Sequence, residues 1–490
     1  ALPLAAAPLI YLIGRLVYRA EKARVNPAGW LALAALLVTA GLWVITYLRA
    51  KTEPLLLLTG QVTLAGDAVF LLMSATAIGL GLMVTLFSIV YMRGEPGEEK
   101  FYALLTANIG TIIGLAATTD LFNLWVWFEA MAVTTYLLVA FYKDLPGSLE
   151  SGIKYLVQSA AGSALILIGI ALVVAETGTL ELNLMVEMLS GPSPLLLAAG
   201  GLFIVGFGVK TALVPMHTWL PDAHSQAPSG ISMMLSGIVI EAGMIAMLRV
   251  LAVFFNVTDL FGPLLLGFAA LNILVGNLMA LRQSEVKRML AYSSVAQVGY
   301  ILLGFGTTFT FGAKDGAISA FFHLMNHALM KGLAFMAAGV FIYVLFLSKG
   351  SHGSLKVSDL NGAARKYPLA ALTFSIAVLA LGGLPPLSGF MSKTAVFLTA
   401  FITRDPWMIA LVIFAALNAV LSLAYYAPLV NRMYRLESSE AVKSGGRMPW
   451  LMGIPLVLMA LLIVVMGFYP MLLSNLFIPA GVNILPFTGF

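Results

Sequence analysis

Three lysines lie inside long apolar segments of the 490-residue sequence: Lys210, Lys331 and Lys393. A charge near the centre of a bilayer costs roughly 2.5–3.5 kcal/mol even on a mild insertion scale. Two acids, Glu129 and Glu241, also interrupt apolar segments. Ionisable groups in such positions are typical of an ion or proton path. We therefore predict that these five residues take part in proton transfer.

Two histidines share helical spacing with one of these lysines. His323, His327 and Lys331 are four residues apart, which places them on one face of a helix over about 12 Å. Imidazole titrates near neutral pH, so this row suits a proton relay. Two histidines four apart could also bind a metal, and packing alone is a third interpretation. Nearby sequence offers no cysteine or carboxylate to complete a ligand set.

The other two lysines lie next to predicted helix breaks. Pro215 follows Lys210, and the pair Pro385 and Pro386 precedes Lys393. Proline removes a backbone donor, and the freed polar groups are tolerated in a membrane only where protein or water covers them. The mirrored order of proline and lysine is what inverted repeats produce. Kinks that only aid packing would give the same pattern.

Two arrangements of polar residues could also serve proton transfer. Contact between Glu129 and Lys210 would form a coupled ion pair, in which a nearby proton or a displaced partner promotes release from the lysine. The alternative is a protonated Glu129 bonded to a backbone carbonyl. Beyond Pro215, three residues could form a polar mouth or simply a satisfied loop cluster: His217, Asp222 and His224.

Composition indicates an integral membrane protein. Hydrophobic residues make up 60% of the sequence and charged residues 10%, and the mean hydropathy is +0.98. A soluble globular chain carries about a quarter charged residues. Cysteine is absent from the sequence, which excludes disulfides, thiolate metal sites and iron–sulfur ligation by these residues. We predict no cofactor, no metal and no nucleic-acid partner.

Fourteen apolar segments are long enough to span a membrane, for which about 20 residues are needed. They lie near residues 2–18, 29–48, 66–91, 101–118, 121–142, 152–175, 195–216, 230–255, 262–282, 289–308, 316–347, 369–402, 407–432 and 451–474. The eleventh and twelfth are too long for a straight span and are expected to tilt, bend or break. The predicted fold is an all-α polytopic membrane protein with broken seventh and twelfth helices.

Basic residues are distributed unevenly among the predicted connections. Odd-numbered connections hold 19 Lys or Arg residues, including Lys22 and Arg24, whereas even-numbered connections hold 5. Positive charge accumulates on the cytoplasmic side of membrane proteins. We therefore predict a multi-pass protein of the cell membrane with both termini on the outer side. The polar stretches around 348–366 and 436–447 would be cytoplasmic loops.

Four stretches carry a resemblance to a known family. Residues 210–229 read KTALVPMHTWLPDAHSQAPS and resemble the signature K-x-x-x-x-P-x-H-x-W-L-P-D-A-H-x-x-A-P of antiporter-like subunits. Supporting stretches are VKRMLAYSSVAQVGY at 286–300, FHLMNHALMK at 322–331 and GLPPLSGFMSK at 383–393. The family is shared by Mrp-type sodium/proton antiporters, respiratory complex I and membrane-bound nickel–iron hydrogenase complexes.

The resemblance implies two inverted five-helix repeats and a chain of ionisable groups along the membrane midplane. The implied units are three helices at 1–100, repeats at 101–255 and 256–432, and a C-terminal loop and span at 433–490. Glu129 and Lys210 match the family's fifth- and seventh-span pair. His323 and His327 match its eleventh-span connection, and Lys393 its twelfth-span lysine. Many relatives carry lysine or histidine in the eighth span, where Glu241 is the counterpart.

These observations favour a proton-translocating subunit of a redox-driven, complex I-related pump similar to the membrane-bound hydrogenase. Expected partners are further antiporter-like and small Mrp-like subunits, a redox arm, the lipid bilayer, and protons or sodium ions. The sequence predicts no redox or hydrolytic site within the chain. The first alternative is the D-type subunit of an Mrp-type antiporter, whose short C-terminal end the chain resembles. A stand-alone transporter and a non-conducting scaffold are further alternatives.

Overall fold

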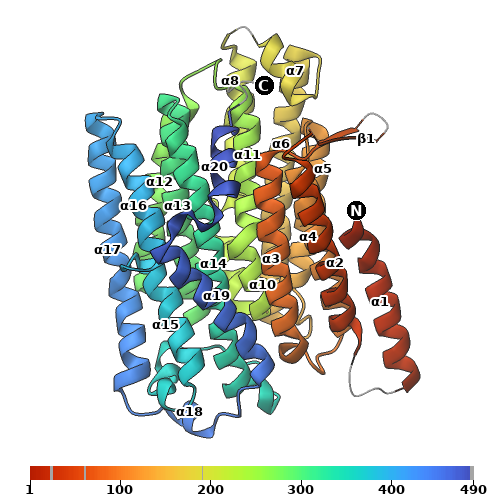
Figure 1. The fold of residues 1–490 in the computed structure, drawn as a ribbon, viewed down its shortest axis with the longest axis vertical. Helices are drawn as coiled ribbons and strands as arrows, with labels where there is room; N and C mark the ends of the chain where they lie inside the picture. The colour runs from red at the N-terminus through yellow and green to blue at the C-terminus, as the bar shows by residue number, and fades with distance from the viewer. Residues whose placement is uncertain (22–25, 54, 60–61, 190, 486–490) are drawn as a thin grey trace.

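A computed structural model describes residues 1–21, 26–53, 55–59, 62–189 and 191–485. Long helices run side by side, with α1 at one edge and α17 at the opposite edge (Figure 1). This arrangement confirms the predicted all-α polytopic class. Lys22 and Arg24, which contribute to the predicted charge asymmetry, lie outside the described residues.

The helices follow the predicted apolar segments closely. Those of the first half are α1 (Leu2–Glu21), α2 (Ala28–Arg49), α3 (Ala68–Tyr91), α4 (Glu98–Ala116), α5 (Leu121–Val139), α6 (Pro146–Thr177), α7 (Leu182–Met188), α8 (Pro194–Thr211), α9 (Trp219–Gln226), α10 (Ser229–Met234), the π-helical turn η1 (Leu235–Val239) and α11 (Ile240–Val253). Those of the second half are α12 (Phe261–Leu281), α13 (Val286–Phe311), α14 (Lys314–Leu345), α15 (Pro368–Gly382), α16 (Ser388–Phe401), α17 (Pro406–Arg435), α18 (Glu440–Ser444), α19 (Trp450–Phe468) and α20 (Ser474–Val482).

Eleven helical segments in the described part of the chain are long and apolar enough to cross a membrane, judged by length and composition. Three shorter apolar segments are Leu2–Val17, Pro368–Gly382 and Pro470–Val482. The count of fourteen spans, the inverted repeats and the four-unit division therefore remain predictions. The predicted break in the twelfth segment is present between α15 and α16, whereas the long eleventh segment forms the continuous helix α14.

The most buried helices carry the unusual polar residues. Segments Ser229–Val253 and Val286–Phe311 are almost entirely enclosed, and α14 is nearly so. Peripheral helices expose large apolar side chains, such as Val38 on α2 and Leu417 on α17. Because these outer helices offer hydrocarbon to the lipid, the inner ones can hold polar groups away from it.

Glycines allow two helices to approach closely near Lys210. A Cβ atom added at Gly162 on α6 would lie 2.8 Å from the Gly206 carbonyl on α8. A Cβ atom added at Gly206 would lie 2.7 Å from the Gly162 carbonyl. Small residues at such crossings allow membrane helices to pack backbone against backbone. This contact brings α6 against the end of α8 where Lys210 lies.

A short β-hairpin and α7 lie at the same end of the molecule (Figure 1). Strands β1 (Leu56–Thr59) and β2 (Val62–Ala65) are antiparallel, with Leu56 opposite Ala65. An isolated bridge between Leu64 and Thr118 ties β2 to the connection before α5. The sequence analysis predicted neither element, because each is shorter than a membrane span.

Candidate ion-translocation site

The first helix break lies directly after Lys210. Helix α8 ends at Thr211, Ala212 adopts φ 58°, and α9 begins at Trp219. A left-handed conformation is uncommon for alanine and requires support from its surroundings. Asn272 on α12 provides it: its amide oxygen accepts from Val214 N at 2.9 Å, and its amide nitrogen donates to Ala212 O at 3.1 Å. The Val214–Pro215 peptide bond within the break is cis.

Lys210 is enclosed among aromatic rings. Its side chain is 1% exposed, and its ammonium has no hydrogen-bond partner among the described protein atoms. The Nζ atom lies 4.6 Å from the ring centre of Tyr155 and 5.6 Å from that of Phe128. Trp219 stacks on the far side of Tyr155 with 3.9 Å between ring centres. Its indole nitrogen donates to the Val209 carbonyl at 2.7 Å, so the broken segment folds back onto α8.

Glu129 lies near Lys210 without a direct ion pair. In the described part of the chain, no ion pair within 4.0 Å joins Glu129 to Lys210, although their charges interact. The buried Oε1 atom of Glu129 has no protein hydrogen-bond donor or acceptor within that part. The structure therefore shows neither the direct pair nor the carbonyl-bonded acid considered from the sequence. It shows a half-buried Glu129 and a fully buried Lys210 that are not in direct contact.

The acidic residue of the eighth segment contacts a histidine on another helix. Glu241 is fully buried at the start of α11, directly after the π-helical turn η1. Its Oε1 atom lies 2.6 Å from Nδ1 of His327 on α14. The second oxygen of Glu241 and Nε2 of His327 have no partner among the described protein atoms. The carboxylate thus has a histidine as its partner.

The two other members of the predicted row on α14 contact other helices. His323 shares one hydrogen bond with Ser392 on α16 at 2.9 Å and one with Gln297 on α13 at 3.1 Å. Lys331 donates to the Leu290 carbonyl at 2.7 Å and to Ser293 Oγ at 2.6 Å. Like His327, both are fully buried. The predicted row on one helix is present, and each member of it contacts a different group.

A continuous hydrogen-bonded chain runs through Lys331. His224 Nε2 contacts Ser236 Oγ at 3.1 Å, and Ser236 contacts Ser294 at 2.7 Å. Ser294 donates to the Leu290 carbonyl, which also accepts from Lys331. On the other side of Lys331, Ser293 is hydrogen bonded to the Tyr426 hydroxyl. This chain joins α9, η1, α13, α14 and α17 through the interior.

The second helix break places Lys393 next to His323. The turn between α15 and α16 contains a cis Pro385–Pro386 bond. Lys393 is 3% exposed and donates to the Leu381 carbonyl at 2.7 Å. The amide nitrogen of Gln297 donates to the same carbonyl at 3.0 Å, and its oxygen contacts His323. Hydrogen bonds therefore connect His323, Gln297 and Lys393, with the Leu381 carbonyl shared by the last two.

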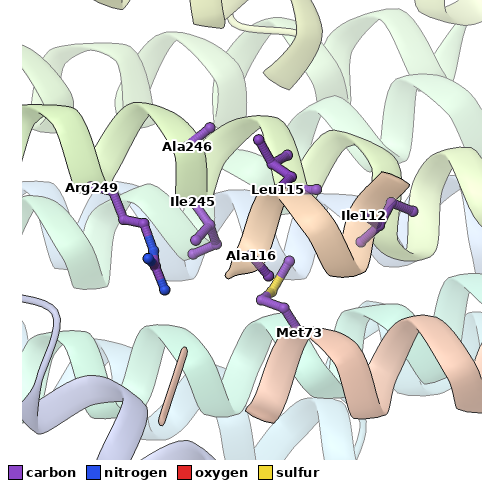
Figure 2. Close-up of a pocket in the computed structure, with 8 residues that line it drawn as sticks. Met73, Ile112, Leu115, Ala116, Ile245, Ala246 and Arg249 are labelled. Carbon is purple, nitrogen blue, oxygen red and sulfur yellow. The ribbon is translucent and has the colours of Figure 1, made fainter. Parts of the chain in front are cut away.

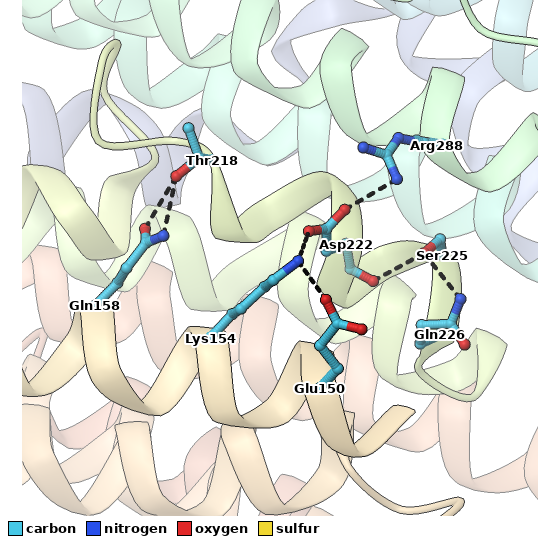
Figure 3. Close-up of polar contacts among 8 residues, drawn as sticks. All are labelled: Glu150, Lys154, Gln158, Thr218, Asp222, Ser225, Gln226 and Arg288. Atoms are coloured by element: carbon cyan, nitrogen blue, oxygen red, sulfur yellow. Dashed lines mark hydrogen bonds and ion pairs between the residues drawn. The ribbon is translucent and has the colours of Figure 1, made fainter. Parts of the chain in front are cut away.

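The three predicted mouth residues do not form one cluster. His224 is fully buried, and its ring stacks on Phe335 with 4.5 Å between ring centres. Asp222 lies at the surface and pairs with Lys154 at 3.1 Å and Arg288 at 2.9 Å (Figure 3). These pairs join α6, α9 and α13. The expectation that Asp222 and His224 line the same mouth is therefore wrong, because α9 turns them in different directions.

Two titratable groups outside the spans, His217 and Glu285, have shifted pKa values. Burial lowers the pKa of His217, whose ring lies 6.3 Å from that of Tyr292. Burial raises the pKa of Glu285, and the positive charges of Lys287 and Arg288 oppose this effect. His217 therefore favours its neutral form.

Sequence analysis missed several buried polar groups. Lys287 was counted among loop bases, yet it is 4% exposed and donates to the Ala227 carbonyl at 2.5 Å. Its place at the edge of a span concealed its burial. Asn272, Gln297 and Ser293 were also missed, because uncharged polar residues scarcely change the hydropathy of a segment.

One cavity between α3, α4 and α11 is too small for a ligand. Met73, Leu115 and Arg249 border a pocket with a volume of about 10 Å³ (Figure 2). That volume is barely enough for one water molecule. Arg249 instead has a structural role, since it binds both oxygens of Asp67 and the Thr118 carbonyl. No group of three or more potential metal-binding side chains occurs within the described ranges.

The fold and site together define a class of protein. A bundle of membrane helices encloses Lys210, Glu241, Lys331 and Lys393, two of them next to helix breaks, and hydrogen bonds connect much of this interior. Such buried ionisable groups on broken helices are typical of ion-translocating membrane proteins.

Comparison with known sequences identifies the family. The family model described as "NADH:quinone oxidoreductase/Mrp antiporter, TM" matches residues 118–422. The model described as "NADH-Ubiquinone oxidoreductase (complex I), chain 5 N-terminus" matches residues 58–102. F(420)H(2) dehydrogenase subunit N of Methanosarcina mazei is 32% identical, with 92% of each chain covered. NADH-quinone oxidoreductase subunit N of Desulforudis audaxviator is 32% identical over 81% of this chain and 80% of its own.

Solved structures show the same fold. A chain of the membrane-bound sulfane sulfur reductase, an archaeal respiratory membrane complex, has a TM-score of 0.87 and 30% identity, covering 99% of this chain and 96% of its own. A chain of respiratory complex I from Thermus thermophilus has a TM-score of 0.77 and 27% identity, covering 96% and 98%. A chain of the Mrp complex from Dietzia has a TM-score of 0.85 at 21% identity, covering 99% and 96%. The chain belongs to the NADH:quinone oxidoreductase/Mrp antiporter family of membrane subunits.

Proposed function

We propose that this chain is the proton-translocating, antiporter-like subunit of a redox-driven membrane complex. Two relatives that cover four fifths or more of the chain are subunits of dehydrogenase complexes, and they support a redox-driven host. The chain of the sulfane sulfur reductase, itself part of a respiratory complex, supports the same conclusion. Further membrane subunits and a redox arm are the expected partners.

One observation carries the proposal: titratable side chains are held inside the bundle by polar groups on neighbouring helices. Glu241 contacts His327, Lys331 contacts Leu290 and Ser293, and Lys393 shares the Leu381 carbonyl with Gln297. Burying such groups is costly, so their retention in an enclosed row supports a role in transport. Isolated ionisable residues facing lipid would not support it.

Electrostatic coupling between adjacent members of the row can drive proton release. His327 and Lys331 are one helical turn apart, about 6 Å along α14. Two positive charges at that distance repel each other by roughly 3 kcal/mol at an effective dielectric constant near 20. A proton that charges His327 would therefore favour loss of the Lys331 proton by about two orders of magnitude. Glu241 would stabilise the charged His327 while this occurs.

Lys210 would connect to this row across α11. A Cβ atom added at Gly243 would lie 3.0 Å from Lys210 Cγ, so Lys210 packs against α11 two residues beyond Glu241. Water molecules would complete proton transfer between these groups, since hydrogen-bonded water is the usual bridge between buried polar groups. In this mechanism the charge of Glu129 determines the electrostatic potential at Lys210. Lys393 releases or receives protons at the other end of the row.

The proposal includes an orientation in the cell membrane. The charge asymmetry of the predicted connections supports an orientation with both termini on the outer side. The cytoplasmic face would then include Asp222 with its partners Lys154 and Arg288, and also His217. Protons are the proposed coupling ion, with sodium as the alternative.

Replacement of Lys210 tests the proposed role of the chain. In the intact complex in membrane vesicles, Lys210→Ala is expected to lower proton translocation through this subunit by roughly 100-fold or more, the typical contribution of a proton-transfer group. Lys143→Ala, an exposed loop base, is the matched control. Unchanged pumping in a fully assembled Lys210→Ala complex would instead favour the non-conducting scaffold.

Copurification distinguishes the redox-driven complex from the Mrp alternative. An affinity tag on the chain should recover a subunit with redox centres along with other membrane subunits. Recovery of Mrp-like membrane proteins alone would reassign the chain to an antiporter without redox chemistry. Transport by the purified chain alone in proteoliposomes would favour the stand-alone transporter.

A further inference from the structure

Two of the three lysines that lie within apolar segments share an arrangement that the proposed proton path does not require. Lys210 Nζ lies 4.6 Å from the ring centre of Tyr155, and Lys393 Nζ lies 4.6 Å from that of Tyr300. Both tyrosines are at most 1% exposed. The two pairs come from different parts of the chain, and each lysine lies beside a helix break.

From this repeated geometry we infer that the rings of Tyr155 and Tyr300 are positioning residues that stabilise the ammonium forms of Lys210 and Lys393. The inference rests on the proposed function and adds two positioning residues to it. A cation above an aromatic face within about 6 Å is attracted by the negative potential of the ring, and the attraction increases when water is excluded. Both lysines meet this condition.

The surroundings of Tyr155 indicate that its ring, and not its hydroxyl group, is the functional part. The buried hydroxyl lies near the Thr135 side chain but forms no well-aligned hydrogen bond with the described protein atoms. The ring itself is held on its other face by Trp219, with 4° between the ring planes. Trp219 is fixed in turn by its hydrogen bond to the Val209 carbonyl, one residue before Lys210. The stack is therefore anchored to the helix end that carries the lysine.

Tyr300 has corresponding support around Lys393. Its ring meets His323 edge-on at 6.2 Å and Phe397 at 6.0 Å. Its hydroxyl is within 3.4 Å of the Ala415 carbonyl, near the upper limit for a hydrogen bond. Tyr300 thus contacts both His323 and Lys393.

A ring suits a lysine that must release its proton repeatedly. When lysine becomes neutral, a directly paired carboxylate would remain as an unpaired buried charge, which is strongly unfavourable. An aromatic ring bears no net charge, so it can stabilise the ammonium form of the lysine. After the proton leaves, the ring leaves no unpaired buried charge. Lys331 differs from the other two, because a carbonyl and a hydroxyl bind it and no cation–aromatic contact is recorded for it in the described part of the chain.

Substitutions at Tyr155 separate the ring's electrostatic role from its volume. In the intact complex, Tyr155→Phe should keep proton translocation near the unmodified level, whereas Tyr155→Leu should reduce it by roughly 2- to 30-fold. Tyr102→Leu is the matched control, since Tyr102 is equally buried, its hydroxyl also forms no well-aligned hydrogen bond with the described protein atoms, and no lysine lies over its ring among the recorded cation–aromatic contacts.

Because the leucine variant could fail to fold, a series of fluorinated phenylalanines at position 155 tests the same role of the ring with little change in shape. Each fluorine withdraws charge from the ring face with little change in shape, so translocation should fall stepwise from Phe to trifluoro-Phe. Equal activity across the series, in an assembled complex, would overturn the inference and leave Tyr155 as a space-filling residue. Failure of the proposed function itself would appear separately, as unchanged pumping in Lys210→Ala.

Discussion

The contact between Glu241 and His327 is an acid–imidazole pair with both partners completely enclosed. The family resemblance implies a base at this position of the eighth span, where this chain has an acid. The structure shows that the neighbouring helix supplies the imidazole, at 2.6 Å. The acid can therefore hold a proton or stabilise a charged histidine without a base of its own helix.

Neutral replacement of this acid should separate charge from hydrogen bonding. Glu241→Gln keeps an amide near His327 but removes the negative charge, so we expect an assembled complex with a stability loss of about 0.5–1.5 kcal/mol. Proton translocation should fall sharply because charged His327 loses its counterion. Thermal unfolding and vesicle acidification measure the two effects. Glu187→Gln, an exposed change on α7, serves as control, and full pumping in Glu241→Gln would contradict this role.

Residues with full charges could be selected from the sequence, whereas their uncharged partners could not. Lys210, Lys331 and Lys393 were evident because a charge in an apolar segment is rare. Tyr155 and Ser293 gave no comparable signal, since tyrosine and serine occur in many packed membrane helices. Their importance depends on contacts between helices far apart in sequence, which hydropathy does not encode.

Among the elements, the broken helix at α8 depends on a side chain from another helix. Asn272 on α12 satisfies the Val214 amide and the Ala212 carbonyl, and its amide nitrogen also lies 3.2 Å from the Val295 carbonyl. In a region without bulk water, these backbone groups need such a partner. One amide side chain thus fixes the break that positions Lys210.

Removal of that amide should destabilise the break. Asn272→Leu leaves buried backbone groups unsatisfied at about 1–3 kcal/mol each, so the thermal unfolding midpoint of the complex should fall. Leu271→Ala, at an exposed position on the same helix, should have a much smaller effect. An unchanged midpoint in Asn272→Leu would show that the break is held by other contacts.

Helix breaks could be predicted, while finer irregularities could not. Pro215 and the pair Pro385 and Pro386 indicated the breaks after α8 and α15, since proline cannot continue the backbone hydrogen bonds. The π-helical turn at Leu235–Val239, just before Glu241, has no proline to indicate it. It arises within a segment whose packing is wholly internal, so tertiary contacts and not local propensity decide it.

For the molecule as a whole, the arrangement in the membrane is the feature most open to direct measurement. The charge asymmetry predicts that Lys143 faces the cytoplasm and Lys314 faces outward. Because the sequence contains no cysteine, one introduced at either position is the sole labelling site in these 490 residues.

Labelling of intact cells with a membrane-impermeant maleimide tests this topology. Lys314→Cys should react from outside, and Lys143→Cys should react only after the membrane is opened. Both positions are exposed and lie outside the polar row, so transport should be retained. Labelling of Lys143→Cys in intact cells would reverse the orientation.

The strongest test of the whole account is the number of protons translocated per electron by the intact complex when Lys331 is replaced. Lys331 is fully buried, and through Leu290 and Ser293 it joins the His224 side of the hydrogen-bonded chain to the Tyr426 side. We predict that Lys331→Met lowers the ratio while electron transfer continues in an assembled complex, and that Lys314→Met, at an exposed position of the same helix, leaves it unchanged. An unaltered ratio in Lys331→Met would contradict a proton path through this interior.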